Sequence, residues 1–532
     1  MSWPLAATVL LAGAATLGIE MLASRLLAPY FGTSQPIWAV IIGMTLLYLA
    51  LGYHVGGRLA DRRPNERLLY HLIAIAAFAT VLIPLIARPI LHSAQTALSS
   101  AAVGGLLGAL AGVLILFAVP VTLLAMVSPF AIRLQLRQST QGIEAAGRTA
   151  GTLSALSTLG SILGTFLTVL VLIPGIGTAR TLFLYALLLA ALALFGARDR
   201  FALLAVLAVL AITGIQLGLP AMVKSAGCRD CTLISEYESA YNYIQVAERA
   251  GPAGDRQIAL VLNEGLAIHS IYRPVYEHTQ DARDLLTDGG PWDYFAITPF
   301  FYPQRSPDSV HSMALLGAGA GTAAAQFLAI YGPDKRVDAV EIDPQIIEVG
   351  RRYFGLQDAS ISSLHPNYHV YAADARAWLS PRTTRYDIVA IDAYHQPYIP
   401  FHLTTREFFE DVRAHLNERG VAVVNAGLGP DGDDRLGQAI AATMRAVFPQ
   451  VYIIETKRGG NQILVGVSGN VGDGWANMVA NYEQLTNATL REIIGNVNVS
   501  ERPIDPRYTP MTDDHAPIEA LIDSLIFDAA LR

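Results

Sequence analysis

The first 222 residues contain seven apolar segments, each of about the length that a helix needs to cross a bilayer. These segments restrict the fold more than any other feature of the sequence. A helix needs roughly 20 apolar residues to cross a bilayer. The first segment lacks the basic start and the small-residue cleavage site of a signal peptide, so it is expected to be retained. The sequence therefore predicts a multi-pass α-helical membrane domain over residues 1–222. The segments are 4–22, 37–57, 68–87, 101–126, 153–173, 182–197 and 201–219.

Five residues in or next to these segments have a predicted role. Pro120 and Pro129 are expected to kink or end the fourth segment. Gly160 and Gly164 form a G-x-x-x-G step in the fifth segment, a spacing that lets membrane helices approach closely. Glu20 is either a functional carboxylate at membrane depth or an interfacial residue that pairs locally.

Arginines are distributed unevenly over the short loops between the segments. The second, fourth and sixth loops carry nine arginines, whereas the first, third and fifth carry three. Because basic loops stay on the cytoplasmic side of a membrane, the N-terminus is predicted to be cytoplasmic. With seven spans, everything after residue 219 would then lie outside the cytoplasm.

Beyond Cys228 the density of charged residues rises to that of an ordinary soluble domain, although the whole chain is only 15% charged. The net charge of −7 and the lack of a basic stripe with interleaved aromatic residues argue against a nucleic-acid partner. Cys228 and Cys231 are the only cysteines. A structural zinc site normally needs four protein ligands. The pair therefore predicts a disulfide or two incidental thiols, and no metal site is expected.

The stretch 311–344 has the pattern of a strand, a glycine turn, a helix and a second strand. A short apolar run ends at Gly317, Gly319 and Gly321, and Glu341 closes the next apolar run twenty residues after Gly321. Glycines let the backbone approach a ligand, and a carboxylate at this place accepts hydrogen bonds from ribose hydroxyl groups. The stretch predicts a nucleoside site, the alternative being a tight turn without a ligand.

The globular half divides into a strand region and a larger α/β domain. Residues 233–270 alternate in strand fashion and predict two or three strands in hairpins, within a linker and strand region over residues 223–305. The aromatic-rich stretch 288–302 is expected to line a cleft and to lead into a helix. Residues 306–532 are predicted to form a doubly wound α/β domain with ligands at the carboxyl ends of its strands. The predicted elements of that domain include strands 313–316, 337–342, 369–372, 386–391 and 421–425 and helices 344–353 and 405–417.

Five stretches of the globular half, in this order and spacing, resemble the spermidine synthase (polyamine aminopropyltransferase) family of polyamine biosynthesis. They are SAYNYIQV, ALLGAGAG, AVEIDP, ADARAWL and YDIVAIDAYHQPYIPFHLTTREFFEDV, and TDDHAPIEAL at 512–521 is similar to the tail of membrane-fused bacterial members. The resemblance covers about residues 235–426. It implies a Rossmann-like methyltransferase/spermidine synthase fold and a transferase without a tightly bound cofactor. Such an enzyme would move an aminopropyl group from decarboxylated S-adenosylmethionine to an amine and release methylthioadenosine.

The resemblance also implies roles for individual residues. Glu341 would hold the ribose, and Asp392 would be the catalytic carboxylate. An amine must be neutral to attack a carbon next to a sulfonium, so a carboxylate that receives its proton suits this reaction. Asp374 and Ala375 would meet the adenine. The nucleoside turn would consist of Gly317, Gly319 and Gly321, and the further candidates for substrate binding are Tyr241, Asn242, Glu264, Tyr394, His395 and Asp514.

Three positions depart from the pattern of diamine-using members. An Asp inside the glycine turn is replaced by Ala320, an Asp three residues after the catalytic one by His395, and a Gln of the early strand by Asn242. Because a dicationic acceptor needs several carboxylates, the acceptor is left open between putrescine and another amine. His395 is either a base or a solvated loop residue. The carboxylates that could compensate are Glu238, Glu264, Asp513 and Asp514.

Two other functions stay open at this point. One is a methyltransferase that uses S-adenosylmethionine on the same fold, and the other is a transporter or sensor that binds a polyamine or nucleoside without turnover. The expected partners are a small-molecule amine, an adenosyl sulfonium, the lipid bilayer and, because the family commonly forms dimers, a second copy of the chain. Cytosolic supply of nucleosides favours a cytoplasmic globular part, against the basic-loop count, so its side of the membrane stays open.

Overall fold

The structure of the chain is a computed structural model that describes residues 3–31, 35–98, 104–138, 146–218, 231–239, 241–251, 254–263, 268–394, 399–429, 432–497 and 503–530. It divides into two compact units. The helical unit comprises Met1–Ser225 with Glu238–Ala240, and the globular unit comprises Ala226–Tyr237 with Tyr241–Arg532. Each unit is described by itself.

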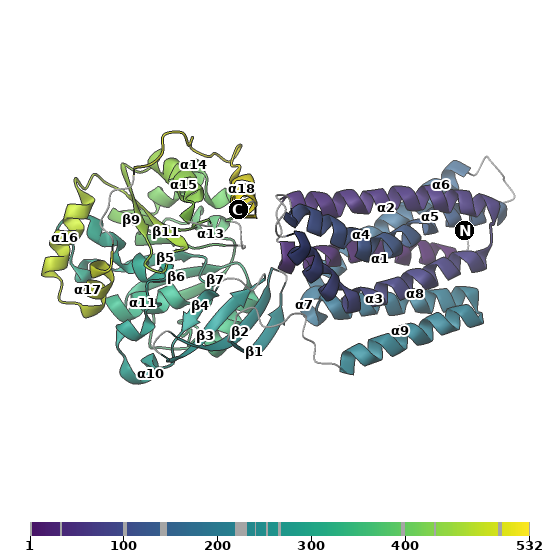
Figure 1. Cartoon of the computed structure of the whole chain (residues 1–532), viewed down its shortest axis with the longest axis horizontal. Helices are drawn as coiled ribbons and strands as arrows, with labels where there is room; N and C mark the ends of the chain where they lie inside the picture. Colours follow the sequence, from purple (N-terminus) through teal and green to yellow (C-terminus); the bar gives the residue numbers. More distant parts are fainter. Residues whose placement is uncertain are drawn as a thin grey trace. The chain divides into compact units, whose positions relative to one another are not determined.

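Among its described residues, the helical unit has six helices that are long and apolar enough to cross a membrane. Figure 1 shows the helices of this unit. These candidate spans are Trp3–Ala28, Ile37–Arg62, Glu66–Ala94, Leu106–Arg137, Ala146–Ile176 and Thr178–Ala197. The seventh predicted segment is a shorter apolar helix, α9, at Arg200–Gly218. The other elements are α1 (Trp3–Phe31), α2 (Gln35–Arg62), α3 (Glu66–Leu98), α4 (Gly104–Ala125), α5 (Val127–Gln138), α6 (Ala146–Leu167), η2 (Thr168–Leu172), α7 (Ile173–Ile176) and α8 (Thr178–Ala197).

The predicted break in the fourth segment and the predicted close helix approach are both confirmed. Helix α4 contains Pro120 and ends at Ala125, after which α5 starts as a separate helix with Pro129 near its beginning. A methyl group added at Gly160 would lie 2.0 Å from the Leu10 carbonyl oxygen, which places α6 backbone to backbone against α1. Only glycine permits this separation.

A small antiparallel sheet opens the globular unit. It has four strands in sequence order, and the β2–β3 and β3–β4 pairs are antiparallel, as expected from the hairpin pattern. Its strands are β1 (Thr232–Glu238), β2 (Tyr243–Ala250), β3 (Arg256–Leu262) and β4 (Ile268–Tyr272). Cys231, directly before β1, is disulfide-bonded, whereas Cys228 lies outside the described residues.

The larger sheet has seven strands in the order β10-β11-β9-β8-β5-β6-β7. Strands β5 to β9 run parallel and alternate with helices, and β10 and β11 add an antiparallel edge. This is the predicted α/β architecture. Its strands are β5 (Ser312–Leu316), β6 (Arg336–Glu341), β7 (Tyr368–Ala372), β8 (Tyr386–Ile391), β9 (Leu416–Gly427), β10 (Gln450–Glu455) and β11 (Asn461–Val467).

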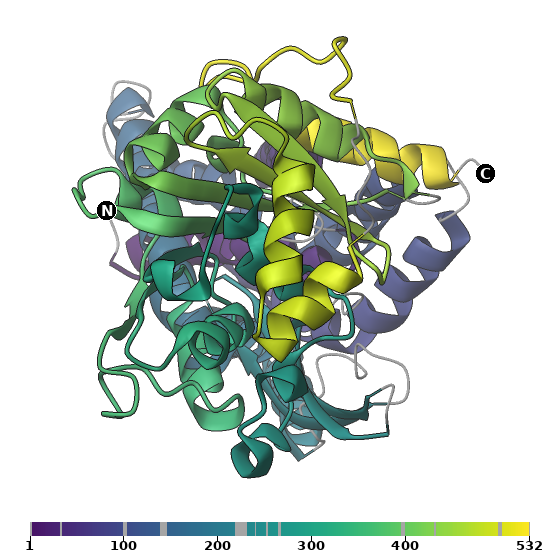
Figure 2. The same ribbon diagram turned by 90° about the vertical axis from the view of Figure 1, so that its left-hand side faces the viewer.

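Helices cover both faces of this sheet (Figure 1). One apolar core contains residues of α11, α16 and α17, and the other contains residues of α13, α14, α15 and α18. Figure 2 shows the yellow-green helices α16 and α17 in front of strands of the large sheet. The helices are α11 (Thr322–Tyr331), α12 (Pro344–Tyr353), α13 (Ala375–Leu379), α14 (Arg406–Ala414), α15 (Arg435–Arg445), α16 (Gly474–Gln484), α17 (Ala488–Gly495) and α18 (Ile518–Ala530), with the one-turn helix α10 (Tyr276–Thr279) after β4.

Two predicted elements differ from the structure. The aromatic stretch 288–302 does not lead into a helix, because it forms the 3-10 helix η4 (Pro291–Phe301) itself and buries every side chain from Trp292 to Phe301. The helix predicted over 405–417 ends at Ala414, and β9 begins at Leu416, five residues before the predicted strand. Leu416 is buried in the core on the α14 side, which explains the early start of the strand.

Candidate active site

The carboxyl ends of β5, β6 and β8 meet at one edge of the large sheet. Leu316 is in register with Val340 of β6 and with Ile391 of β8. The residues that directly follow these positions, Gly317, Glu341 and Asp392, therefore lie together, and all three line a cavity of about 680 Å³. Ligands of doubly wound sheets bind at this edge.

The glycine turn between β5 and α11 depends on positive φ angles. Gly317, Gly319 and Gly321 have φ values of 95°, 52° and 99°. A Cβ atom at Gly317 would lie 2.4 Å from the Asp392 carbonyl oxygen, so no other residue fits there. Gly317 and Gly319 line the cavity. Gly321 is the N-cap of α11 and is not among the cavity-lining residues, so its part is to shape the turn.

Glu341 is buried at the end of β6. Its Oε2 atom accepts a hydrogen bond from the Gly319 backbone N–H at 2.9 Å, and its Oε1 atom accepts one from the Asp343 N–H at 3.1 Å. Burial raises the pKa of the Glu341 carboxyl to about 7, although both backbone hydrogen bonds work against this shift. The carboxylate that is predicted to hold the ribose is thus tied to the glycine turn.

Asp374 and Ala375 line the same cavity from the start of α13. The Oδ1 atom of Asp374 accepts a hydrogen bond from the Ala377 N–H at 2.9 Å and caps this helix. Its Oδ2 atom lies 3.0 Å from Nε2 of His402. His402 was not predicted from the sequence, because 28 residues separate it from Asp374.

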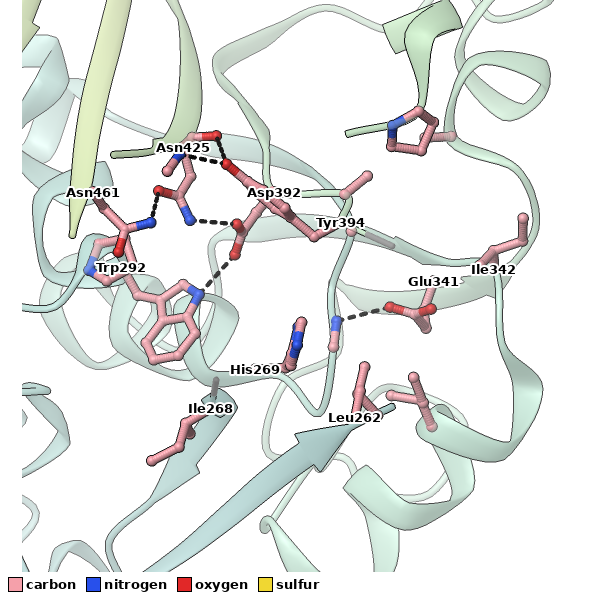
Figure 3. A pocket seen from close by; sticks show the side chains of 18 of the residues that line it. Leu262, Ile268, His269, Trp292, Glu341, Ile342, Asp392, Tyr394, Asn425 and Asn461 are labelled. Carbon is pink, nitrogen blue, oxygen red and sulfur yellow. Dashed lines mark hydrogen bonds between the residues drawn. The ribbon is translucent and has the colours of Figure 1, made fainter. Parts of the chain in front are cut away.

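Asp392 accepts two hydrogen bonds at the end of β8 (Figure 3). The Trp292 indole N–H donates to Oδ2 at 2.7 Å, and the Asn425 amide N–H donates to Oδ1 at 2.7 Å. Burial raises the pKa of Asp392 to about 6, and the two hydrogen bonds limit this rise. Asn461 in turn donates to Oδ1 of Asn425 at 2.9 Å. The result is an oriented carboxylate beside the cavity.

Three of the predicted substrate-binding residues line the cavity, namely Tyr241, Asn242 and Tyr394. Asn242 is buried and donates to Oδ2 of Asp343 at 3.0 Å, so its amide stabilises the segment that follows β6. The Tyr394 hydroxyl donates to the Asn425 carbonyl at 3.0 Å and accepts from the Gly427 N–H. Tyr394 therefore fixes the strand end that carries Asn425.

The other candidates for the acceptor are placed less favourably or cannot be judged. Glu264 and His395 lie outside the described residues. Asp514 is exposed and does not line the cavity, and its predicted contact with substrate stays a prediction. Asp513 forms a two-pronged ion pair with Arg376, at 2.7 Å for each hydrogen bond, so it anchors the C-terminal stretch to α13.

Two further positions at which a carboxylate could bind the acceptor contribute none to the cavity. Glu238 accepts a hydrogen bond from the Thr178 N–H at 2.9 Å within the helical unit, and it does not line the cavity. Ala320 is buried in an apolar cluster with Ile244 and Val349. Its N–H donates to Ser270 Oγ at 2.8 Å.

The family model and the similar curated proteins described below are polyamine aminopropyltransferases. The family model of the spermine/spermidine synthase domain matches residues 308–456. A probable polyamine aminopropyl transferase of Bifidobacterium longum is 30% identical over 320 residues, which are 57% of this chain and 66% of that protein. A polyamine aminopropyltransferase of Vibrio vulnificus is 30% identical over 240 residues, which are 44% of this chain and 72% of that protein. The chain thus spans about two thirds of the length of these relatives, which by their names are transferases.

Among solved structures, a probable spermidine synthase from Corynebacterium glutamicum is similar to this chain. It is 19% identical with a TM-score of 0.36, and the match covers 53% of this chain and 100% of the other.

Proposed function

The chain belongs to the spermine/spermidine synthase family, and from this membership we propose that it is an aminopropyltransferase. The donor is decarboxylated S-adenosylmethionine, which is a substrate rather than a bound cofactor, and the acceptor is an amine. The amine nitrogen forms a bond to the propyl carbon next to sulfur while the carbon–sulfur bond breaks. The electron pair of that bond stays on sulfur, so the sulfonium becomes the neutral thioether of methylthioadenosine.

The donor half of the site would use the glycine turn and the acidic ends of two strands. Gly317 and Gly319 leave room for the nucleoside, and Glu341 would accept hydrogen bonds from its ribose hydroxyl groups. Asp374 and Ala375 would meet the adenine. These assignments follow from the family membership and agree with the position of all five residues on one cavity.

The main support for the proposal is the position of Asp392 and its hydrogen bonds. Hydrogen bonds from Trp292 and Asn425 fix both of its oxygens, each at 2.7 Å. Each oxygen keeps a lone pair, so the group can take the proton that the attacking amine loses. Holding the amine and the donor in one cavity provides much of the remaining acceleration.

We also propose that the helical unit is inserted in a membrane. Large apolar side chains on its surface support membrane insertion, because contact with lipid is more favourable for them than contact with water. Exposed fractions reach 66% for Leu170 of η2, 65% for Leu204 of α9 and 61% for Phe166 of α6.

The decisive experiment follows the nucleoside product. The full chain in detergent micelles is incubated with a mixture of amines and with either decarboxylated S-adenosylmethionine or S-adenosylmethionine, and the product is identified by mass spectrometry. We expect methylthioadenosine from the first donor. Asp392→Asn should lower its formation by about 10²–10⁴-fold, the usual contribution of a proton-accepting group, whereas Asp334→Asn, at an exposed turn, should not.

Other products would point to other functions. S-adenosylhomocysteine from the second donor would identify a methyltransferase. Binding of either donor without turnover, seen as a thermal shift, would favour a transporter or sensor. Each of these results would contradict the proposal, as would the absence of any nucleoside product.

A further inference from the structure

Few carboxylates line the cavity among the described residues, and the proposed donor contacts use most of them. Among the described residues that line it, only Glu341, Asp374 and Asp392 carry a carboxyl group. If Glu341 and Asp374 bind the nucleoside as proposed, Asp392 alone is left for the reacting amine. Within the described lining, a second ammonium group of a diamine would find no carboxylate.

The β10–β11 turn brings a cation to the same end of the cavity as Asp392. Arg458, Gly459, Gly460 and Asn461 line the cavity. Asn461 is linked to Asp392 through Asn425 by two hydrogen bonds, of 2.9 Å and 2.7 Å. In Figure 3, Asn461 and Trp292 lie on the opposite side of Asp392 from Glu341. The turn therefore borders the acceptor end of the cavity.

Hydrogen bonds to η4 and to the segment before it fix the backbone of this turn. The Arg458 N–H donates to the Gly289 carbonyl at 3.2 Å. The neighbouring Lys457 N–H donates to the Tyr294 hydroxyl at 2.9 Å. Gly459 and Gly460 have φ values of 67° and 84°, a conformation that glycine adopts readily in turns. The backbone that carries the Arg458 side chain is therefore held in place.

The charge of Arg458 is not neutralised within the described part of the chain. Its guanidinium has no ion pair and no hydrogen bond to a described residue, and the residue is exposed at the edge of the cavity. Burial lowers the pKa of Arg249, and the nearby positive charge of Arg458 lowers it further. The carboxylates of Asp288 and Asp255 raise the pKa of Arg249.

We propose that the acceptor is an amine that carries an anionic group, a carboxylate or a phosphate, and that Arg458 binds this group while Asp392 receives the proton of the amine. The inference rests on the proposed aminopropyl transfer and specifies its substrate class. A guanidinium offers paired N–H donors that match a carboxylate or a phosphate. The same charge repels the far ammonium group of a diamine.

Two acceptors of equal length make the test direct. 4-Aminobutyrate and 1,4-diaminobutane share a four-carbon chain and a reacting amine, and they differ only in the charge of the far group. Methylthioadenosine formation is measured with each, with the full chain in detergent micelles and with butylamine as the neutral reference. We expect kcat/KM to be at least ten-fold higher for 4-aminobutyrate than for 1,4-diaminobutane.

Variants at one turn separate binding of the anion from general damage. Arg458→Gln should lower kcat/KM for 4-aminobutyrate about ten-fold and leave butylamine unchanged, and Arg458→Glu should reverse the preference. Lys457→Gln removes a charge from the same turn at a position that does not line the cavity, and it should change neither value. Binding of methylthioadenosine, which contacts the opposite end, serves as the folding control for all three.

The outcomes are distinguishable. Methylthioadenosine formed preferentially with 1,4-diaminobutane, or a preference that Arg458→Gln does not change, would overturn this inference and leave the proposed function intact. No methylthioadenosine with any amine would overturn the proposed function itself. Phosphoethanolamine in solution and vesicles of phosphatidylethanolamine, used as separate acceptors, tell whether an anionic amine comes from solution or from a lipid headgroup.

Discussion

The Asp392 carboxyl group has a raised pKa because burial outweighs its two hydrogen bonds. If Asp392 accepts the proton of the amine as proposed, it must be ionised, so kcat/KM should fall as the pH drops below about 6. The Trp292 indole N–H stabilises the ionised form, and its removal raises the pKa further. In Trp292→Phe, the acidic limb of the pH profile should therefore move to higher pH.

The control is Trp475→Phe, which changes a buried tryptophan that packs on Phe301 and does not line the cavity. Its pH profile should match that of the unchanged protein. If the limb stays in place in Trp292→Phe as well, Asp392 is not the group that titrates.

Glu341 predicts a pH dependence of nucleoside binding. Its pKa is about 7 in the folded, unliganded chain, so the carboxyl is mostly protonated at pH 6 and mostly ionised at pH 8. In the proposed role, the ionised form would accept hydrogen bonds from both ribose hydroxyl groups. Affinity for methylthioadenosine should hence increase about ten-fold from pH 6 to pH 8. Titration calorimetry at both pH values measures this.

Substitution identifies the titrating group. Glu341→Gln should bind more weakly at pH 8 and show almost no difference between the two pH values. A pH dependence that persists in this variant would assign the effect to another group.

Residues at strand ends were predictable, and their partners were not. Gly317, Glu341 and Asp392 follow apolar runs whose parallel register brings them to one edge, so sequence alone indicated their proximity. Trp292 is 100 residues from Asp392 in the chain, and Asn425 is 33 residues away. No local pattern relates residues at such separations, because the sheet order that joins them is a property of the whole fold.

At the scale of elements, the contact between α1 and α6 depends on small residues. A methyl group at Gly164 would lie 2.1 Å from the Ala14 carbonyl oxygen. Gly164→Ala should therefore push the two helices apart and destabilise the helical unit by about 1–3 kcal/mol, the usual cost of overpacking. The measurement is the melting temperature of the full chain in detergent micelles.

The matched control lies in the same helix. Gly151 of α6 has no heavy atom within 4 Å of an added methyl group. Gly151→Ala should therefore leave the melting temperature unchanged or raise it slightly, because alanine favours a helix by up to about 1 kcal/mol over glycine. Equal effects of the two substitutions would show that the close contact does not matter for stability.

Element types were easier to predict than their ends. The period of the apolar residues indicated the strands around the glycine turn within one or two residues. The aromatic stretch before it resembled a cleft lining, yet only Pro291 and Trp292 of η4 reach the cavity and the rest of this helix fills the core. Aromatic composition alone does not distinguish these two environments, since both bury large side chains.

At the scale of the whole molecule, the number of membrane spans decides on which side the globular unit lies. If the helical unit is inserted in a membrane as proposed, the distribution of basic loops predicts a cytoplasmic N-terminus. Six spans would return the chain to the cytoplasm, and a seventh, α9, would place the globular unit outside. Helix α9 has 19 residues, about 28 Å at 1.5 Å per residue, which is close to the thickness of a hydrocarbon core.

The disulfide at Cys231 favours the second arrangement, because disulfides persist in oxidising compartments and are rare in the cytosol. We therefore expect α9 to cross the membrane. A donor made in the cytosol would then have to cross the membrane. The helical unit would in that case have a function beyond anchoring.

Two reporter fusions test this topology in intact cells. Alkaline phosphatase fused after Arg198, between α8 and α9, should be inactive because that loop is cytoplasmic, whereas the same reporter fused after Arg532 should be active. A fluorescent protein that folds only in the cytosol should give the opposite pair of signals. If both fusion sites report the cytoplasm, α9 does not cross, and the globular unit lies on the side where its nucleoside donor is made.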